Sequence, residues 1–112
     1  MNQENRSPNG NILGPSLPLS IMLLLYTNQR VKFTILQKLL ETTPGNLDYH
    51  LHRLAKAGYV TITKQLFPRR PHTLIIITED GKTAFKTYVE RFQEILGRIA
   101  TEDQETPEGS KT

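Results

Sequence analysis

The chain has 112 residues, a formal net charge of +3 at pH 7 and no cysteine. This length suits one domain with a single hydrophobic core, and the lack of cysteine excludes disulfides, thiol chemistry and Cys-based zinc sites. The longest apolar run, at residues 21–26, is far too short to span a membrane and no stretch resembles a secretory signal, so we expect a cytoplasmic protein.

The two ends of the chain differ in composition from the middle. Residues 1–14 are rich in Asn, Gly and Ser, and residues 101–112 contain no large apolar side chain, so we expect both segments to be disordered. Residues 30–100 hold 12 Lys and Arg against 6 Asp and Glu, whereas residues 101–112 hold one Lys against four acidic residues. The sequence therefore predicts a basic domain over 15–100 with a flexible arm and an acidic tail, and a basic surface suits a polyanionic partner.

The first predicted helix covers residues 17–27 and is apolar around almost its whole circumference. A helix of this kind must be buried on several sides, so we expect it to contact a partner chain as well as its own core. Residues 30–33 alternate and predict a brief extended segment, after which Thr34 is placed to cap a helix over 35–41. We expect that second helix to bury Ile35, Leu36, Leu39 and Leu40.

A third helix is predicted over residues 43–57, directly after a short turn. Thr43 can cap it, Pro44 occupies the first helical position, where no N–H is needed, and Gly58 ends it. Leucines at spacings of four and three form an apolar stripe, namely Leu47, Leu51 and Leu54. The opposite face carries Gly45, Tyr49, His52, Arg53 and Lys56.

Two alternating, β-branched segments follow, at residues 59–67 and 72–77, and predict a two-stranded antiparallel hairpin. Two prolines in the connection at 68–71 exclude regular pairing, so Arg69 and Arg70 face solvent or a ligand. The tip of the hairpin is therefore expected to be a basic loop.

The last predicted helix is the longest, with Thr78 as its cap and acidic residues in its first turn. Its apolar residues continue at spacings of four and three in a heptad-like seam. Packing on its own domain is one explanation; the other is a two-fold dimer interface shared with the 17–27 helix. The interface residues would be Leu17, Ile21, Leu24, Phe85, Tyr88, Val89, Phe92, Ile95, Leu96 and Ile99.

The order helix, short strand, helix, turn, helix, hairpin, helix is the layout of a winged helix, a mostly helical α+β fold. The phrases LDYHLHRLAKAGYV, RRPHTLIIIT and TEDGKTAF, in that order, resemble the compact winged-helix DNA-binding transcription regulators related to the MarR and ArsR families. The resemblance covers about residues 17–97. It implies a homodimeric transcription regulator, with repression as the expected activity and double-stranded DNA as the partner.

The exposed face of the 43–57 helix is suited to the major groove of DNA, which admits one helix. Asn46, Tyr49 and Arg53 are the candidate base contacts, because Asn pairs with adenine and Arg with guanine. The lysines are candidates for phosphate contacts, and the loop arginines for phosphate or minor-groove contacts. The full predicted set is Thr43, Gly45, Asn46, Tyr49, His50, Arg53, Lys56, Lys64, Arg69, Arg70 and His72.

Several of these residues have simpler interpretations. Tyr49 could be a half-buried aromatic, Arg53 and Lys56 could form a solvated face, and His50, beside the leucine stripe, is expected to pack rather than bind DNA. Because His50 and His52 diverge on a helix, we expect no metal site. No catalytic motif or phosphate loop occurs, so we expect neither an enzyme nor a cofactor. The alternative function is a winged helix that serves as a protein-interaction module in a larger assembly.

Overall fold

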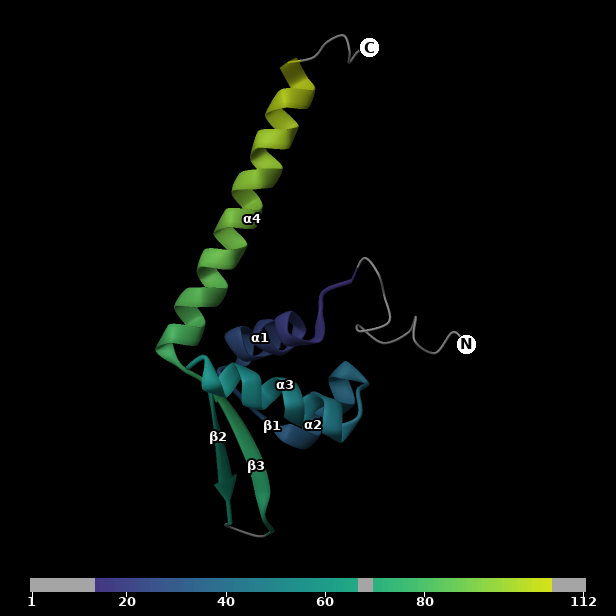
Figure 1. The fold of residues 1–112 in the computed structure, drawn as a ribbon, viewed down its shortest axis with the longest axis vertical. Helices are drawn as coiled ribbons and strands as arrows, with labels where there is room; N and C mark the ends of the chain where they lie inside the picture. Colours follow the sequence, from purple (N-terminus) through teal and green to yellow (C-terminus); the bar gives the residue numbers. More distant parts are fainter. Residues whose placement is uncertain (1–13, 67–69, 106–112) are drawn as a thin grey trace, which may run out of the picture.

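The computed structural model of the chain describes residues 14–66 and 70–105, with side chains as far as residue 101. The elements follow the predicted order, as Figure 1 shows. They are α1 (Leu17–Asn28), β1 (Arg30–Lys32), α2 (Phe33–Leu40), α3 (Pro44–Lys56), β2 (Val60–Gln65), β3 (His72–Ile77) and α4 (Glu79–Glu105). No helix in these ranges is long and apolar enough to cross a membrane.

Helix α1 lies at the centre of the core and contacts the other three helices as well as β1 and β3. Leu17 and Ile21 are only 1% and 0% exposed within the single chain. The prediction that these two side chains lie in a dimer interface is therefore wrong, because their own chain already covers them. Leu24 is half-buried and keeps part of its surface.

The strands form one antiparallel sheet in the order β1-β3-β2. The predicted hairpin of β2 and β3 is present, with Ile62 opposite Ile75. The extended segment at 30–33 becomes a third strand on the other side of β3, with Val31 also opposite Ile75. Ile75 is fully buried at this crossing, so the central strand fixes the position of the hairpin relative to the helices.

Hydroxyl caps define the starts of three helices. Ser16 accepts a hydrogen bond from an α1 backbone N–H at 3.3 Å, Thr43 accepts one in α3 at 3.2 Å, and Thr78 accepts one in α4 at 2.9 Å. The last two confirm the predicted caps. The predicted cap at Thr34 is wrong, because α2 already begins at Phe33 and its N-cap residue makes no side-chain cap bond.

Helix α2 buries only half of the residues expected. Leu36 and Leu40 are 0% and 5% exposed, whereas Ile35 and Leu39 are 43% and 57% exposed. Residues four apart share one face of a helix, and the core takes the face of Leu36 and Leu40. The prediction for Ile35 and Leu39 is therefore wrong, since they lie on the neighbouring face, in contact with solvent.

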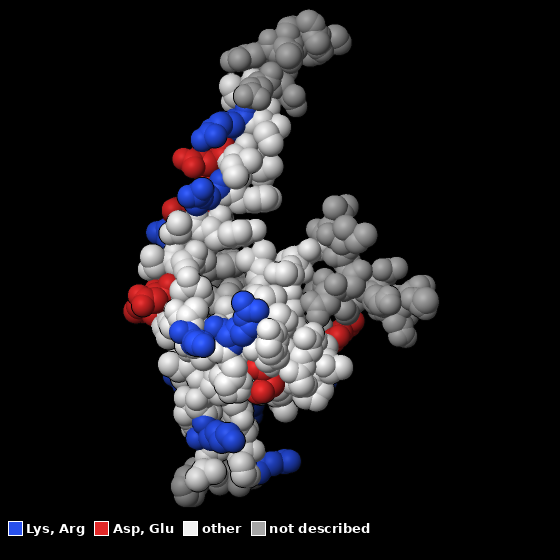
Figure 2. Space-filling view, viewed as in Figure 1, with Lys and Arg blue, Asp and Glu red and all other residues white. Residues whose placement is uncertain are grey.

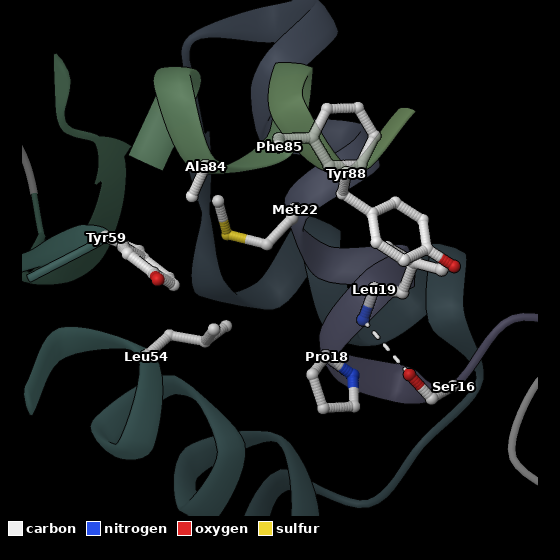
Figure 3. Close-up of a pocket in the computed structure, with 9 residues that line it drawn as sticks. All are labelled: Ser16, Pro18, Leu19, Met22, Leu54, Tyr59, Ala84, Phe85 and Tyr88. Carbon is white, nitrogen blue, oxygen red and sulfur yellow. Dashed lines mark hydrogen bonds between the residues drawn. The ribbon is translucent and has the colours of Figure 1, made fainter. Parts of the chain in front are cut away.

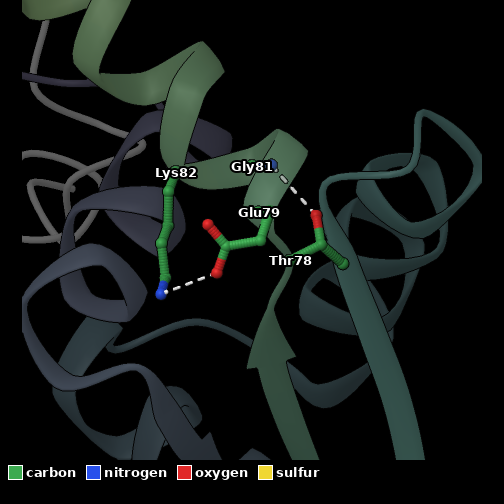
Figure 4. Close-up of polar contacts among 4 residues, drawn as sticks. All are labelled: Thr78, Glu79, Gly81 and Lys82. Atoms are coloured by element: carbon green, nitrogen blue, oxygen red, sulfur yellow. Dashed lines mark hydrogen bonds and ion pairs between the residues drawn. The ribbon is translucent and has the colours of Figure 1, made fainter.

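Helix α4 is fixed to the rest of the fold at its start, and Figure 4 shows the contacts within its first turn. The Thr78 hydroxyl donates to the Gly58 carbonyl at 2.7 Å while it accepts from the Gly81 N–H, and Lys82 pairs with Glu79 at 3.2 Å. A Cβ at Gly81 would collide with the carbonyl oxygen of Tyr59. Only a glycine lets the helix approach the α3–β2 turn this closely.

Beyond the turns that pack on α1, α4 projects away from the other elements, as Figure 1 shows. The radius of gyration is 18.2 Å, whereas a compact chain of this length would have about 13 Å. The helix continues to Glu105, so the first five residues of the predicted tail belong to α4, and residues 106–112 lie outside the described residues. The predicted N-terminal arm lies outside the described residues apart from Gly14.

Candidate DNA-binding surface

One face of α3 is polar and open to solvent. Its opposite face is the predicted leucine stripe, in which Leu47 and Leu51 are 0% and 1% exposed. The solvent face forms a shallow groove of about 400 Å³. The residues that line it are Gly45, Asp48, Tyr49, His52, Arg53 and Lys56.

Tyr49 and Arg53 contact each other on this face. Tyr49 is 56% exposed and lines the groove. An Arg53 guanidinium nitrogen donates to the Tyr49 hydroxyl at 3.3 Å, and the guanidinium carbon lies 5.7 Å from the ring centroid. The aromatic ring thus holds a cationic donor in place at the surface, which lowers the entropy lost when that donor binds a ligand.

Three of the predicted α3 residues do not line the groove. The Asn46 side-chain amide donates to the Thr42 hydroxyl at 3.1 Å, and the Thr43 hydroxyl is occupied as the helix cap. His50 is half-buried, with its ring in edge contact with Tyr49 at 5.0 Å between centroids. The contact with Thr42 uses one of the two N–H donors of the Asn46 amide and fixes the orientation of the group.

Two residues of the groove, Asp48 and His52, are absent from the predicted contact set. The His52 Nδ1 lies 2.9 Å from the Asp48 carbonyl oxygen and 3.3 Å from its carboxylate. Both residues also line a second hollow, which opens toward Lys64 and Thr73 on the hairpin. Helical spacing already places His52 on this face and could have revealed Asp48 as well, because residues 45, 48, 49, 52, 53 and 56 share one face.

The hairpin adds positive charge beside α3. Lys64 is exposed on β2, opposite Thr73 on β3, and Arg70 is exposed near the start of β3. His72 lies at the first position of β3, with Nδ1 3.4 Å from the Arg70 carbonyl oxygen. Arg69, predicted to act with Arg70, lies outside the described residues. Figure 2 shows Lys and Arg side chains over the hairpin end of the molecule.

A second surface lies along α4, where a set of apolar residues is about half exposed. They are Tyr88, Phe92, Ile95, Leu96 and Ile99, at 48% to 52% exposure. In Figure 2 the charged side chains of α4 follow one edge of the helix, and the edge toward α1 carries none over most of its length.

This apolar face leads into a cleft between α1, α4 and the end of α3 (Figure 3). Met22, Leu54, Tyr59 and Tyr88 are among its lining residues, and its volume is about 330 Å³. Phe85, at its edge, is 9% exposed and packs against Tyr26 at 5.1 Å between ring centroids. Phe85 therefore packs mainly in the core of its own chain and presents little surface to a partner. Among the described residues, no three His, Asp or Glu side chains come together to hold a metal ion.

Comparison with known proteins identifies this arrangement. Residues 17–96 match the model of a family described as "Winged helix DNA-binding domain". An uncharacterized protein of Methanocaldococcus jannaschii, MJ0432, is 38% identical over 71 residues, which are 63% of this chain and 77% of that protein.

Among solved structures, the transcriptional regulator homologue of Pyrococcus horikoshii OT3 is 31% identical, with a TM-score of 0.71 over 81% of this chain and 86% of that one. The YusO protein of Bacillus subtilis has a TM-score of 0.70 at 18% identity, over 79% of this chain and 61% of that one, a likeness of fold alone. The structural neighbours are MarR-like transcriptional regulators. The predicted winged helix, with its hairpin wing and long C-terminal helix, is confirmed.

Proposed function

The chain belongs to the winged helix DNA-binding domain family, and on that premise we propose that it is a homodimeric transcription regulator that binds double-stranded DNA with sequence specificity. One observation carries the proposal. The exposed face of α3 holds Arg53 in place against Tyr49, and the hairpin beside it presents Lys64 and Arg70. A donor-bearing helix beside a basic wing is the geometry that reads bases and grips phosphates together.

In this proposal α3 enters the major groove, and Arg53 donates to the O6 and N7 acceptors of a guanine. The exposed ammonium groups of Lys56 and Lys64 bind phosphates on either side, and Arg70 follows the backbone from the wing. Phosphate contacts position the domain without reading sequence, whereas base contacts supply the specificity.

The homodimer is supported by the apolar face of α4. A stretch that includes Tyr88, Phe92 and Ile99 leaves half of each side chain in solvent. An exposed apolar seam of this kind is typical of an interaction surface. A second copy of the same helix offers the matching seam, since a two-fold interface uses the same residues on both sides.

The direction of the two helices follows from the shape of the chain. The uncharged edge of α4 faces the side on which α1 lies (Figure 2). Two parallel α4 helices would bring both globular parts to the same end, where they would compete for the space next to α1. An antiparallel pair places them at opposite ends, and we propose this arrangement, with Tyr88 facing Ile99 and Phe92 facing Ile95 of the other copy.

The antiparallel pair also suits the spacing of a DNA site. The centre of the pair lies between Phe92 and Ile95, roughly 13 Å along the helix from Phe85 at the base of each globular part. The two bases are then roughly 25 Å apart, with the globular parts beyond them. Half-sites about one helical turn apart, roughly 34 to 36 Å, are the distance expected for a dimer of this kind.

Cross-linking tests the dimer and its direction, because the chain has no cysteine of its own. In an antiparallel dimer, Tyr88→Cys and Ile99→Cys should each give no disulfide alone and a mixed disulfide when the two variants are combined. In a parallel dimer each variant would cross-link to itself. Lys86→Cys, on the charged edge, serves as the control that should not cross-link. Sedimentation as a monomer at micromolar concentration would contradict the dimer.

The DNA site itself can be found by selecting bound duplexes from a random pool. The proposal predicts a two-fold symmetric sequence with half-sites about one turn apart. We further propose repression, in which the dimer blocks access to the DNA that it covers. A selected pool without symmetry, or without any enriched sequence, would contradict sequence-specific binding by a dimer.

A further inference from the structure

Asp48 is the one carboxylate among the residues that line the α3 groove and the neighbouring hollow. Its side chain is 60% exposed, on the same face as Tyr49 and Arg53. Near DNA phosphates a carboxylate lowers affinity, since like charges repel. A surface that served only to attract phosphate would gain from any neutral residue at this position, so the presence of Asp48 needs a different explanation.

The neighbouring histidine fixes the position of this carboxylate. The His52 Nδ1 lies 2.9 Å from the Asp48 carbonyl oxygen and 3.3 Å from the carboxylate Oδ1. Both are acceptors, so Nδ1 must carry the hydrogen and donate it. In the neutral ring Nε2 is then an acceptor as well. Asp48 and His52 thus make one side of the α3 face hydrogen-bond accepting, whereas Arg53 and Lys56 make the other side donating.

We infer that Asp48, held in position by His52, reads the exocyclic amino group of a cytosine in the major groove. This inference rests on the proposed function and deepens it. The major groove offers amino donors only on cytosine and adenine. Adenine N6 lies between two acceptors in the groove, its own N7 and the O4 of the paired thymine, and these would repel the second carboxylate oxygen. Cytosine N4 has an acceptor on one side only, the O6 of the paired guanine, and a C5–H on the other. A carboxylate therefore favours cytosine, and Arg53, five residues further along α3, favours guanine.

The test is a comparison of duplexes selected from a random pool by the intact chain and by variants at position 48. The original chain should enrich cytosine at one position in each half-site. Asp48→Ala should lose about tenfold discrimination or more at that position only. Asp48→Asn should shift the preference there from cytosine to adenine, because Asn pairs with the N6 and N7 of adenine. Glu94→Gln, an equal change of charge on α4, should leave the selected sequence unchanged.

His52 is a positioning residue, and its variants separate that role from a structural one. His52→Gln keeps a donor near the carboxylate and should retain the cytosine preference, whereas His52→Ala should weaken the preference at the same position. Circular dichroism should show unchanged helix content in every variant, because both side chains are mostly exposed.

Other outcomes overturn the inference. If the Asp48→Ala and Asp48→Asn pools match that of the original chain at every position, the carboxylate reads no base. If these variants lose preference at all positions, Asp48 supports α3 as a whole and reads no particular base. If the original chain selects no sequence, the proposed function fails and the inference fails with it. If it selects a site without the cytosine, the proposed function stands and the inference alone fails.

Discussion

Replacement of Gly81 by alanine should destabilise the fold, although alanine is the better helix former. The new Cβ would lie closer to the Tyr59 carbonyl oxygen than real Cβ contacts allow, and would also touch Ile77. That oxygen accepts the Thr78 N–H at 3.0 Å, so it cannot move without straining the junction of α4. Overpacking lowers the free energy of unfolding by about 1–3 kcal/mol, and loss of the hydrogen bond lowers it by about 1 kcal/mol. The better helix propensity of alanine raises it by about 1 kcal/mol.

The net loss in the free energy of unfolding is therefore about 2 kcal/mol, which corresponds to about 8 °C in melting temperature for a chain of this size. Gly97→Ala is the matched control in the same helix, since nothing lies within 4 Å of its Cβ position. It should raise the stability by up to about 1 kcal/mol. Thermal and urea unfolding at equal protomer concentration measure the stability of both variants. If Gly81→Ala is neutral or stabilising, the close approach of α4 to the α3–β2 turn is refuted.

Two other pairs of variants test the core and the DNA-facing surface. Leu36→Ala should lower the free energy of unfolding by about 2–5 kcal/mol, and Leu39→Ala by less than about 1, in urea titrations; equal losses would contradict the burial of α2. Lys64→Ala should reduce the salt dependence of DNA binding by about two ions per dimer without a change in base preference. Arg53→Ala should instead cost about 1–3 kcal/mol of discrimination at one base pair per half-site; the opposite pattern would reverse the roles of these residues.

The helices and strands could be predicted from local patterns. Which strands pair, and which face of each helix meets the core, could not. Capping hydroxyls, the leucine stripe of α3 and the alternation of β2 and β3 are contained in a few neighbouring residues. Pairing of β1 with β3 joins segments more than forty positions apart, which no local pattern reports. The exposure of Ile35 and Leu39 was missed for the same reason, since it depends on which face of α2 meets the core.

The candidate site was predicted at the level of the helix but not of every side chain. Tyr49, Arg53 and Lys56 line the groove as their spacing predicts. Asn46 lies on the adjoining face, and its contact with Thr42 depends on the conformation of the turn. Asp48 was missed because an acidic residue does not fit a search for basic DNA contacts, although its helical position places it on the same face.

The most direct test of the proposed function is the affinity of the intact chain for random duplex DNA, measured by fluorescence anisotropy across a salt titration. Lys56, Lys64 and Arg70 give three candidate phosphate contacts per protomer and six per dimer. The logarithm of the binding constant should then fall linearly with the logarithm of salt concentration, with a slope of about −5. Absence of binding at low salt, or a slope near zero, would contradict DNA binding and favour a protein-interaction module.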